Sequence, residues 1–381
     1  MSFITILACV LFFCGAIYLL QIIQFIVGIQ KLKHGNNATL PSISVLVPAY
    51  NEEANIEQCV QSLVAQDYPR DKFEIVIIDD QSTDATAAIA QKLSQQYSNV
   101  RYIRVTEKPH TVSPKINAFR FVIPKTTGEL IFTTDADCFV SPQWLSLSAK
   151  YFEEHVGVVT GTTLYKNTHQ TEKILFGIQF LDFLSHTACA AGAIGNNRVN
   201  NCNGSNMAFR RSAYDEVGGF DSMAHLNAGE DSLLAQKIAA TKNWSVRFSL
   251  EPETNVITNP VQTWKDFFHQ RMRWVSQTTE YRKETVFLLV CSFVYYIALT
   301  ISFLFSIFDF QFFILLVISY VPKFIIDFLI LNKFTSLTNT RSLLSYYIFA
   351  SIIHIPTVLY VVFGGYFGSF QWKGKTVERT S

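Results

Sequence analysis

Long stretches without a charged side chain lie near both ends of this 381-residue chain and enclose a middle of ordinary polarity. No Asp, Glu, Lys or Arg occurs from Met1 to Gln30, or from Val286 to Phe308. A helix of about 20 apolar residues is long enough to cross a bilayer. The sequence therefore predicts membrane-spanning helices. Their expected ranges are 3–29, 286–308, 310–331 and 343–367.

The basic residues that follow the first span predict its orientation. Lys31, Lys33 and His34 come directly after it, and positive charge beside a span marks the cytoplasmic side. The first segment also lacks the basic start and small-residue cleavage site of a secretory signal, so we expect a retained anchor. The middle of the chain should then lie in the cytosol.

The number of C-terminal spans is left open at two or three. Lys323 and Asp327 lie four residues apart in 310–331, where they can pair on one helix face. An ion pair inside a span is costly and often functional, but a helix lying near the membrane interface explains it equally well. The tail is basic, with Lys373, Lys375 and Arg379 against Glu378. This favours a cytosolic C-terminus, whereas three C-terminal spans favour the opposite side.

These patterns divide the chain into four parts. We expect a transmembrane anchor at 1–30, a cytosolic domain at 41–282, a membrane region at 286–367 and a tail at 368–381. Membrane lipid is therefore an expected partner. The net charge of +1 argues against nucleic acid as a partner. The seven cysteines show no CxxC pair, and the eight histidines show no zinc-binding pattern.

Apolar strands and helical segments alternate in the middle of the chain. Expected strands are 43–47, 73–78, 100–105 and 130–134, and helical stretches lie around 51–64 and 83–97. This alternation predicts an α/β fold with a mostly parallel sheet. Ligands of such sheets bind beyond the carboxyl ends of the strands. Four aspartates should lie at that edge: Asp79, Asp80, Asp135 and Asp137.

Two of these aspartates suit a metal ion. Asp135 and Asp137 are separated by one residue after a strand, and Mg²⁺ binds one or two carboxylates together with phosphate oxygens. An isolated Asp pair more often caps a turn. Here a second acidic strand end and the intervening Lys115 favour the metal site. A divalent cation would neutralise a diphosphate leaving group.

Two further motifs have both a structural and a catalytic interpretation. Glu230 and Asp231 follow Gly229 and precede an apolar helix, so they cap that helix, serve as a general base, or do both. Gln270, Arg273 and Trp274 share one helix face. Arg suits phosphate and Trp suits a sugar ring, whereas the alternative is an amphipathic helix on the membrane. The polar loop 202–207 is a candidate acceptor-site lining or a simple turn.

Together these segments resemble the inverting family 2 glycosyltransferases, which have a GT-A fold. The resemblance covers roughly 41–282 and rests on five motifs in order. They are Ser44–Glu53, Ile77–Asp84, Thr134–Asp137, Glu230–Asp231 and Gln270–Trp274, the last matching the QxxRW signature of cellulose, chitin, hyaluronan and poly-N-acetylglucosamine synthases. One departure concerns the basic stretch before the metal motif. Pro114–Ala118 keeps a basic and an amide group, at altered spacing.

The resemblance implies a role for each candidate residue. Asp231, with Glu230, would be the catalytic base, and Asp137 and Asp135 would hold Mg²⁺ or Mn²⁺. Trp274 would face the acceptor. The implied ligands of a UDP-sugar donor are Pro48, Ala49, Tyr50, Glu52, Asp80, Lys115, Asp135, Gln270 and Arg273.

The implied function is transfer of a sugar from a UDP-sugar to a lipid or saccharide hydroxyl. We expect an integral protein of a bacterial inner membrane with its catalytic domain in the cytosol. Processive polysaccharide synthesis is the alternative, favoured by QxxRW and opposed by the short membrane region. More remote alternatives are a transporter and a non-catalytic membrane binding protein.

Overall fold

The computed structural model describes residues 2–106, 113–167, 171–223, 229–276, 278–368, 370–372 and 375–377. It forms two compact units. The α/β unit comprises 31–168 and 197–259, and the helical unit comprises 1–30, 169–196 and 260–381. The boundaries of these units differ from those of the predicted parts. Residues 169–196 and 260–282, which lie in the predicted cytosolic domain, group with the terminal helices. Lys373, Glu378 and Arg379 of the basic tail lie outside the described residues.

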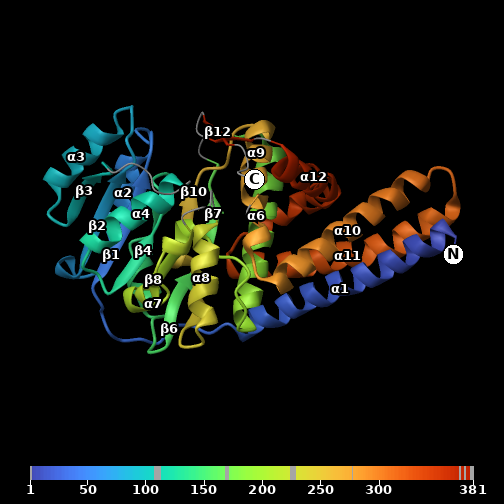
Figure 1. Cartoon of the computed structure of the whole chain (residues 1–381), viewed down its shortest axis with the longest axis horizontal. Coiled ribbons are helices and arrows are strands. Elements are labelled where there is room, and N and C mark those ends of the chain that lie inside the picture. The colour runs from blue at the N-terminus through green and yellow to red at the C-terminus, as the bar shows by residue number, and fades with distance from the viewer. Residues whose placement is uncertain are drawn as a thin grey trace. The chain divides into compact units, whose positions relative to one another are not determined.

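A seven-stranded sheet forms the centre of the described α/β unit (Figure 1), in the order β3-β2-β1-β4-β8-β6-β9. The pairs β1–β2, β2–β3, β1–β4 and β6–β9 are parallel, while β8 runs antiparallel to β4 and β6. The predicted mostly parallel α/β fold is therefore confirmed. The strands are β1 (Ile43–Ala49), β2 (Phe73–Asp79), β3 (Val100–Arg104), β4 (Leu130–Thr133), β6 (Val156–Thr160), β8 (Met207–Arg210) and β9 (Ser245–Phe248).

Alternate residues of the central strands enter two separate cores. Val45 and Val47 of β1 pack with helices α2 (Ile56–Val64) and α3 (Thr86–Gln96) on one face. Leu46, between them, packs with α4 (Pro114–Val122) and α8 (Glu230–Ala240) on the other. Because side chains alternate across a strand, a strand covered on both faces is apolar throughout. This explains the continuous apolar runs in the sequence.

A small second sheet continues the chain beyond β4. It has the order β5-β10-β7, from β5 (Phe139–Val140), β10 (Val256–Thr258) and β7 (Thr163–Tyr165). The segment 134–138 is thus held between β4 and β5, at the carboxyl end of β4. Short helices α5 (Trp144–Ala149) and α7 (Arg211–Glu216) complete the described secondary structure of this unit, apart from 3₁₀ turns.

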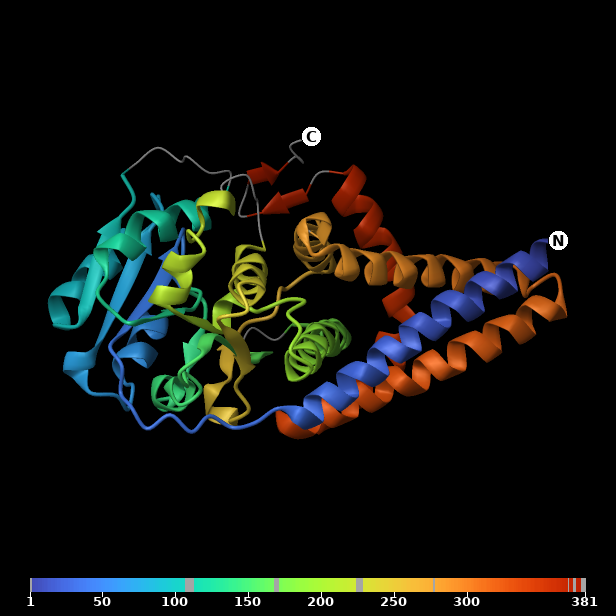
Figure 2. The same cartoon turned by 60° about the horizontal axis from the view of Figure 1, so that its bottom comes forward.

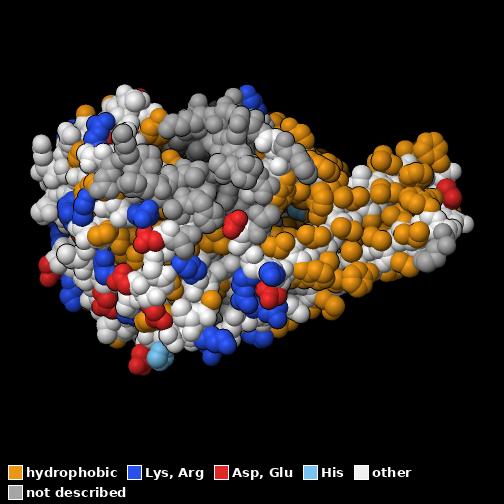
Figure 3. Space-filling model, in the orientation of Figure 1, with side chains coloured by type: hydrophobic (Ala, Val, Ile, Leu, Met, Phe, Trp, Pro, Cys, Tyr) orange, Lys and Arg blue, Asp and Glu red, His pale blue; other side chains and the backbone are white. Residues whose placement is uncertain are grey.

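Five helices of the described chain are long and apolar enough to cross a membrane. Four match the predicted spans, although α11 continues past the predicted end at 331 to Leu337. The fifth, α6, was not predicted as a span. Figure 3 shows apolar side chains over α1, α10 and α11. The five helices are α1 (Phe3–Lys31), α6 (Lys173–Gly195), α10 (Lys283–Phe305), α11 (Phe310–Leu337) and α12 (Tyr347–Phe367). The helical unit also contains the shorter helix α9 (Trp264–Val275) and a two-stranded sheet of β11 (Phe370–Trp372) and β12 (Lys375–Val377).

The predicted pair in α11 forms and ties that helix to α1, which lies alongside it (Figure 2). Lys323 Nζ lies 2.6 Å from Asp327 Oδ2, and the Tyr18 hydroxyl donates to Asp327 Oδ1 over 2.7 Å. The Lys323 side chain is only 2% exposed. The buried ammonium also lies 5.5 and 5.3 Å from the ring centroids of Tyr18 and Tyr296. Buried charge is thus locally compensated.

Glycines let α1 and α6 approach closely within the helical unit. A Cβ on Gly28 would collide with the backbone oxygen of Gly192, and a Cβ on Gly195 would collide with the backbone of Gly28. The Asn196 side chain donates to the Gln24 carbonyl over 2.7 Å at the same crossing. Helices in lipid associate through such small residues, since packing replaces the hydrophobic effect there.

Candidate active site

The two acidic residues at the end of β2 have different surroundings. Asp79 is fully buried and accepts hydrogen bonds from the Ser82 amide at 2.8 Å and the Tyr102 hydroxyl at 2.9 Å. Asp80 is half-buried, and its amide donates to the Ala49 carbonyl over 2.9 Å. Asp79 therefore supports the turn, and the Asp80 side chain is the one left near the surface.

The segment after β1 is joined to the segment after β2. Ala49 is the register partner of Asp79 across the parallel pair, which brings the predicted donor segment 48–52 beside Asp80. The Asn51 side chain accepts from the Thr83 amide at 2.9 Å, and the Glu52 amide donates to the Thr86 hydroxyl over 2.8 Å. Asn51 has a positive φ of 52°, a conformation that Asn tolerates. These bonds make one preformed edge from two strand ends.

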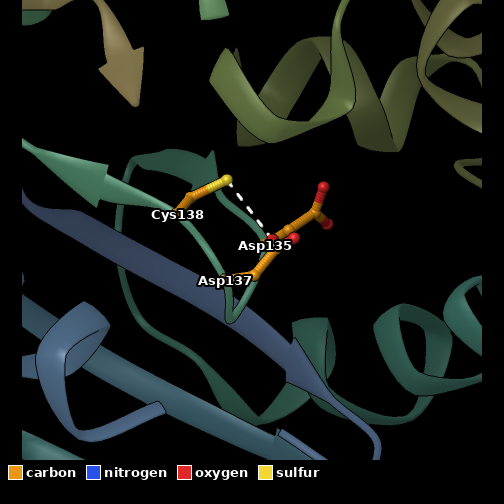
Figure 4. Close-up of side chains that lie close together, drawn as sticks. All are labelled: Asp135, Asp137 and Cys138. Carbon is orange, nitrogen blue, oxygen red and sulfur yellow. Dashed lines mark hydrogen bonds between the residues drawn. The ribbon is translucent and has the colours of Figure 1, made fainter. Parts of the chain in front are cut away.

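The predicted metal residues lie on the loop between β4 and β5 (Figure 4). Ligand atoms of Asp135, Asp137 and Cys138 lie within 4.8 Å of one another. Cys138 is buried, and burial raises the pKa of its thiol well above the ordinary value. The two carboxylates are the oxygen donors that Mg²⁺ and Mn²⁺ prefer. This donor set fits a hard divalent cation.

Thr258, at the end of β10, contributes a contact that the sequence pattern did not indicate. Its hydroxyl lies 3.3 Å from Asp137 Oδ2, within hydrogen-bond distance. The Cys138 thiol lies 3.6 Å from the other oxygen of the same carboxylate. Thr258 comes from a strand paired with β5, so only the tertiary fold brings it to the loop. It orients Asp137 from outside the metal motif.

Lys115 connects the metal motif to the motif predicted to hold the base. Its ammonium lies 2.7 Å from Asp135 Oδ1 and 3.8 Å from Glu230 Oε1. The side chain is placed by the first turn of α4, which Ser113 caps by accepting from the Ile116 amide. Burial lowers the pKa of Lys115, but the nearby carboxylates, Asp135 and Glu230 foremost, together outweigh it and keep this pKa above its ordinary value. The altered spacing noted in the sequence therefore still delivers a cation to this edge.

Glu230 and Asp231 lie in the first turn of α8, where acidic side chains complement the helix dipole, but Gly229 is the N-cap and neither carboxylate makes the predicted N-cap hydrogen bond. Gly229 starts the helix in a left-handed conformation with a φ of 80°. Burial, and then the charge of Glu230, raises the pKa of Asp231 to about 6, against the opposing effects of Lys115 and the Ser232 and Gly204 amides. An acid with this pKa is mostly ionised near neutral pH and accepts a proton readily. The position suits both a stabilising charge at the helix N-terminus and general-base chemistry.

Gly204, in the loop 202–207, packs directly against the Asp231 carboxylate. A Cβ at this position would lie 2.7 Å from Asp231 Oδ2. The Gly204 carbonyl accepts from the Thr133 hydroxyl over 2.8 Å, and the Ser232 hydroxyl accepts from the Cys202 amide over 3.0 Å. Burial raises the pKa of Cys202, in keeping with an unreactive thiol. The sequence indicated only a polar, Gly-containing loop at 202–207. The contact of Gly204 with Asp231 could not be predicted from it.

The third motif belongs to the helical unit, on α9. Gln270, Arg273 and Trp274 are half-buried there. Trp274 packs against the Arg271 guanidinium at 4.2 Å and the Phe183 ring at 5.5 Å. Arg271, at a variable position of QxxRW, is 4% exposed and pairs with Asp182 of α6 over 2.5 Å. Sequence reasoning missed this pair, because its partners lie far apart in the chain.

The α/β unit thus brings together four of the candidate residues, Lys115, Asp135, Glu230 and Asp231. Asp80 lies at a neighbouring strand end. A small pocket is lined by Lys115, Glu230 and Asp231 on its polar side and by apolar side chains such as Phe119 and Leu234. The residues offer a cation-binding pair of carboxylates, a lysine and a carboxylate of raised pKa. That set is suited to displacing a phosphorylated leaving group with a hydroxyl nucleophile.

Comparison with known proteins identifies related sequences and folds. Residues 5–378 match Glycosyl transferase family 21. "Probable glycosyltransferase YdaM" of Bacillus subtilis is 28% identical over 243 residues, covering 63% of this chain and 56% of that protein. "Beta-monoglucosyldiacylglycerol synthase" of Nostoc sp. is 29% identical over 242 residues, covering 62% and 48% respectively. The chain thus spans about half the length of these curated relatives.

A solved structure shares the fold. "Mannosyltransferase PcManGT from Pyrobaculum calidifontis in complex with GDP-Man and Mn2+" aligns with a TM-score of 0.62 at 18% identity. The alignment covers 93% of this chain and 97% of that one.

Proposed function

The chain belongs to glycosyl transferase family 21, and from this premise we propose a membrane-anchored, inverting enzyme that moves a sugar from a UDP-sugar to a lipid or saccharide hydroxyl. The predicted class, a glycosyltransferase, is confirmed, although the matching family is 21 and the motifs had suggested family 2. The observation that carries the proposal is the bridge from Asp135 through Lys115 to Glu230. It supports the proposal because it links a residue that we assign to the donor with a residue of the motif that we assign to the base.

Donor binding is assigned to the strand ends and the Asp135 loop. Asp80, with Pro48, Ala49, Tyr50 and Glu52, would hold the nucleoside. The register of β1 on β2 supports this, because it brings 48–52 beside Asp80. A preformed edge of this kind lowers the entropy cost of binding.

Asp137 and Asp135 would hold Mg²⁺ or Mn²⁺. When bound, the cation supplies positive charge that stabilises the diphosphate leaving group. The two carboxylates are hard oxygen donors, which supports Mg²⁺ or Mn²⁺ as the ion. Lys115 adds a charge on the same side.

Asp231 would act as the general base. Its carboxylate takes the proton of the acceptor hydroxyl as that oxygen forms a bond to the anomeric carbon. The bond from this carbon to the diphosphate oxygen breaks on the opposite face, and UDP leaves with the electron pair. A single displacement inverts the anomeric centre, giving a β-linkage from an α-linked donor. The raised pKa of Asp231 supports this role.

Gln270 and Arg273 would steady the diphosphate, and Trp274 would stack near the acceptor. All three residues lie on one short helix, and Trp274 packs against Arg271 and Phe183. This supports the proposal that the helix holds them rigidly. Rigid placement of such groups is what positioning catalysis requires.

The five apolar helices and the relative named "Beta-monoglucosyldiacylglycerol synthase" support a lipid acceptor and a membrane location. We propose a bacterial inner-membrane protein with its α/β unit in the cytosol. The QxxRW residues favour the second candidate, a processive polysaccharide synthase.

Membranes containing the protein test both candidates when incubated with radiolabelled UDP-sugars, and with GDP-mannose as a comparison. We expect one UDP-sugar to give a short lipid-extractable product that carries a single added sugar by mass. A high-molecular-weight, ethanol-insoluble product would favour the synthase. The Asp231→Asn protein is the negative control, and turnover of GDP-mannose alone would refute the UDP assignment.

A further inference from the structure

Lys115 holds its ammonium against the carboxylate that a metal ion would need. Lys115 Nζ is 2.7 Å from Asp135 Oδ1, and only 27% of the lysine side chain is exposed. The ammonium also lies 5.8 Å from the centroid of the Phe119 ring, and Glu230 lies 3.8 Å away on its other side. The lysine is therefore fixed on several sides and does not simply extend into solvent.

A positive charge at this place has opposite effects on the two ligands of the proposed donor complex. It repels a divalent cation on Asp135 and Asp137, and it competes with that cation for Asp135. It attracts the diphosphate, whose oxygens carry negative charge. Coulomb's law makes both effects large at such short range, even with strong solvent screening.

We propose that Lys115 makes metal binding conditional on the nucleotide diphosphate, so that the metal and the nucleotide bind together and the metal alone binds weakly. This inference rests on the proposed function. Without nucleotide, the ammonium occupies Asp135 and disfavours the cation. When the nucleotide is bound, the negative charge of its diphosphate neutralises both the Lys115 ammonium and the metal ion. Linkage requires the effect to be reciprocal, so the metal must strengthen nucleotide binding by the same factor.

The inference is tested by measuring Mn²⁺ binding to the purified full chain in nanodiscs. Free Mn²⁺ is followed by electron paramagnetic resonance, with and without UDP. We expect UDP to tighten Mn²⁺ binding to the wild type at least tenfold. Lys115→Met should bind Mn²⁺ alone about tenfold more tightly, and the gain on adding UDP should shrink by about the same factor.

Two further variants separate charge from structure. Lys115→Arg keeps the charge and should keep most of the coupling. Lys92→Met removes an exposed lysine from α3 and should leave Mn²⁺ binding unchanged. Thermal melting of each protein shows whether it is folded. The wild-type UDP effect needs no variant, so the test survives even if Lys115→Met fails to fold.

The possible failures are distinguishable. Equal Mn²⁺ affinity of the wild type with and without UDP, while UDP itself binds, would overturn the inference and leave the proposed function in place. Unchanged or weaker Mn²⁺ binding by folded Lys115→Met would also overturn it. A wild type that binds no UDP in calorimetry would refute the proposed function itself.

Discussion

The charged cluster around Lys115 in the α/β unit and the ion pairs of the helical unit balance their charges in opposite ways. In the α/β unit, three carboxylates act on the Lys115 ammonium, namely Asp135, Glu230 and Asp231. In the described helical unit, Lys323 pairs with Asp327 and Arg271 pairs with Asp182, one cation to one anion. An acidic excess is costly to hold and favours the binding of a cation or a proton. A balanced pair needs no ligand and fixes how helices pack.

The comparison teaches which charged residues to regard as functional. Asp327 accepts hydrogen bonds from both Lys323 and Tyr18, so the charge of this pair is compensated within the fold. The acidic cluster at the sheet edge combines a charge excess with a shifted pKa, which is typical of an active site. Changes to the Lys323–Asp327 pair should thus affect stability, and changes to the acidic cluster should affect chemistry.

The largest expected effect comes from removing the base. Asp231→Asn should lower the transfer rate about a thousandfold, because proton removal from the acceptor is lost. UDP affinity should be largely unchanged, since the donor residues remain. Single-turnover assays with labelled donor measure the rate, and calorimetry measures UDP binding. Asp215→Asn, on the exposed face of α7, is the matched control. Near-normal turnover by Asp231→Asn would remove Asp231 from this role.

Breaking the balanced pair should affect stability and not chemistry. Lys323→Met leaves the half-buried Asp327 without its cation, which should lower stability by about 3 kcal/mol. The double variant Lys323→Met/Asp327→Leu should recover much of this loss, because neither charge remains. Melting temperatures in nanodiscs give the comparison, with Lys333→Met on the same helix as control. A double variant no more stable than Lys323→Met would contradict the account.

The pH dependence of transfer should report the acidic excess directly. The proposed base must be ionised to act, and the pKa of Asp231 is raised to about 6. If Asp231 is that base, kcat/KM should fall about tenfold per pH unit below that value. From about pH 7 to 8, the ionisation of Asp231 is nearly complete and should no longer change kcat/KM. Melting temperatures over the same range separate loss of activity from unfolding. An acid limb near pH 4 would mean that the site does not raise this pKa.

The smallest effect is expected from the hydroxyl that orients Asp137. Thr258→Val removes one weak hydrogen bond, worth about 1 kcal/mol, which is about fivefold in Mn²⁺ affinity measured with UDP. Thr258→Ser should restore most of it. If Val and Ser variants bind Mn²⁺ equally, the hydroxyl has no orienting role.

Much of the α/β unit was predictable, for a local reason. Strands β1, β2 and β4 appear in the sequence as apolar runs, because a parallel strand buried on both faces must be such a run. Pro48 was expected to end the first run, but it lies within β1 and pairs in register with Ile78. The acidic residues at the ends of β2 and β4 followed from the same pattern. Their shared edge follows from parallel pairing alone.

The helical unit was less predictable. Helix α6 lies within the predicted cytosolic domain 41–282. Its most apolar stretch has a mean hydropathy of 1.4, against 2.6 for that of α1, and contains Asp182 and His186. Most of its most apolar stretch is buried inside the protein, so it need not be as apolar as a lipid-facing helix. The contact of Arg271 with Asp182 joins residues 89 positions apart, beyond any local pattern.

The sequence by itself determined the enzyme class, the strand ends that carry Asp80 and Asp135, and the apolar helices near both ends. These depend on local periodicity and on short motifs, which a linear chain displays directly. Tertiary structure decided that Lys115 bridges Asp135 and Glu230, that Gly204 leaves room for the Asp231 carboxylate, and that Thr258 contacts Asp137. Such contacts depend on which distant segments fold together, so the charge balance of the site appears only in the folded chain.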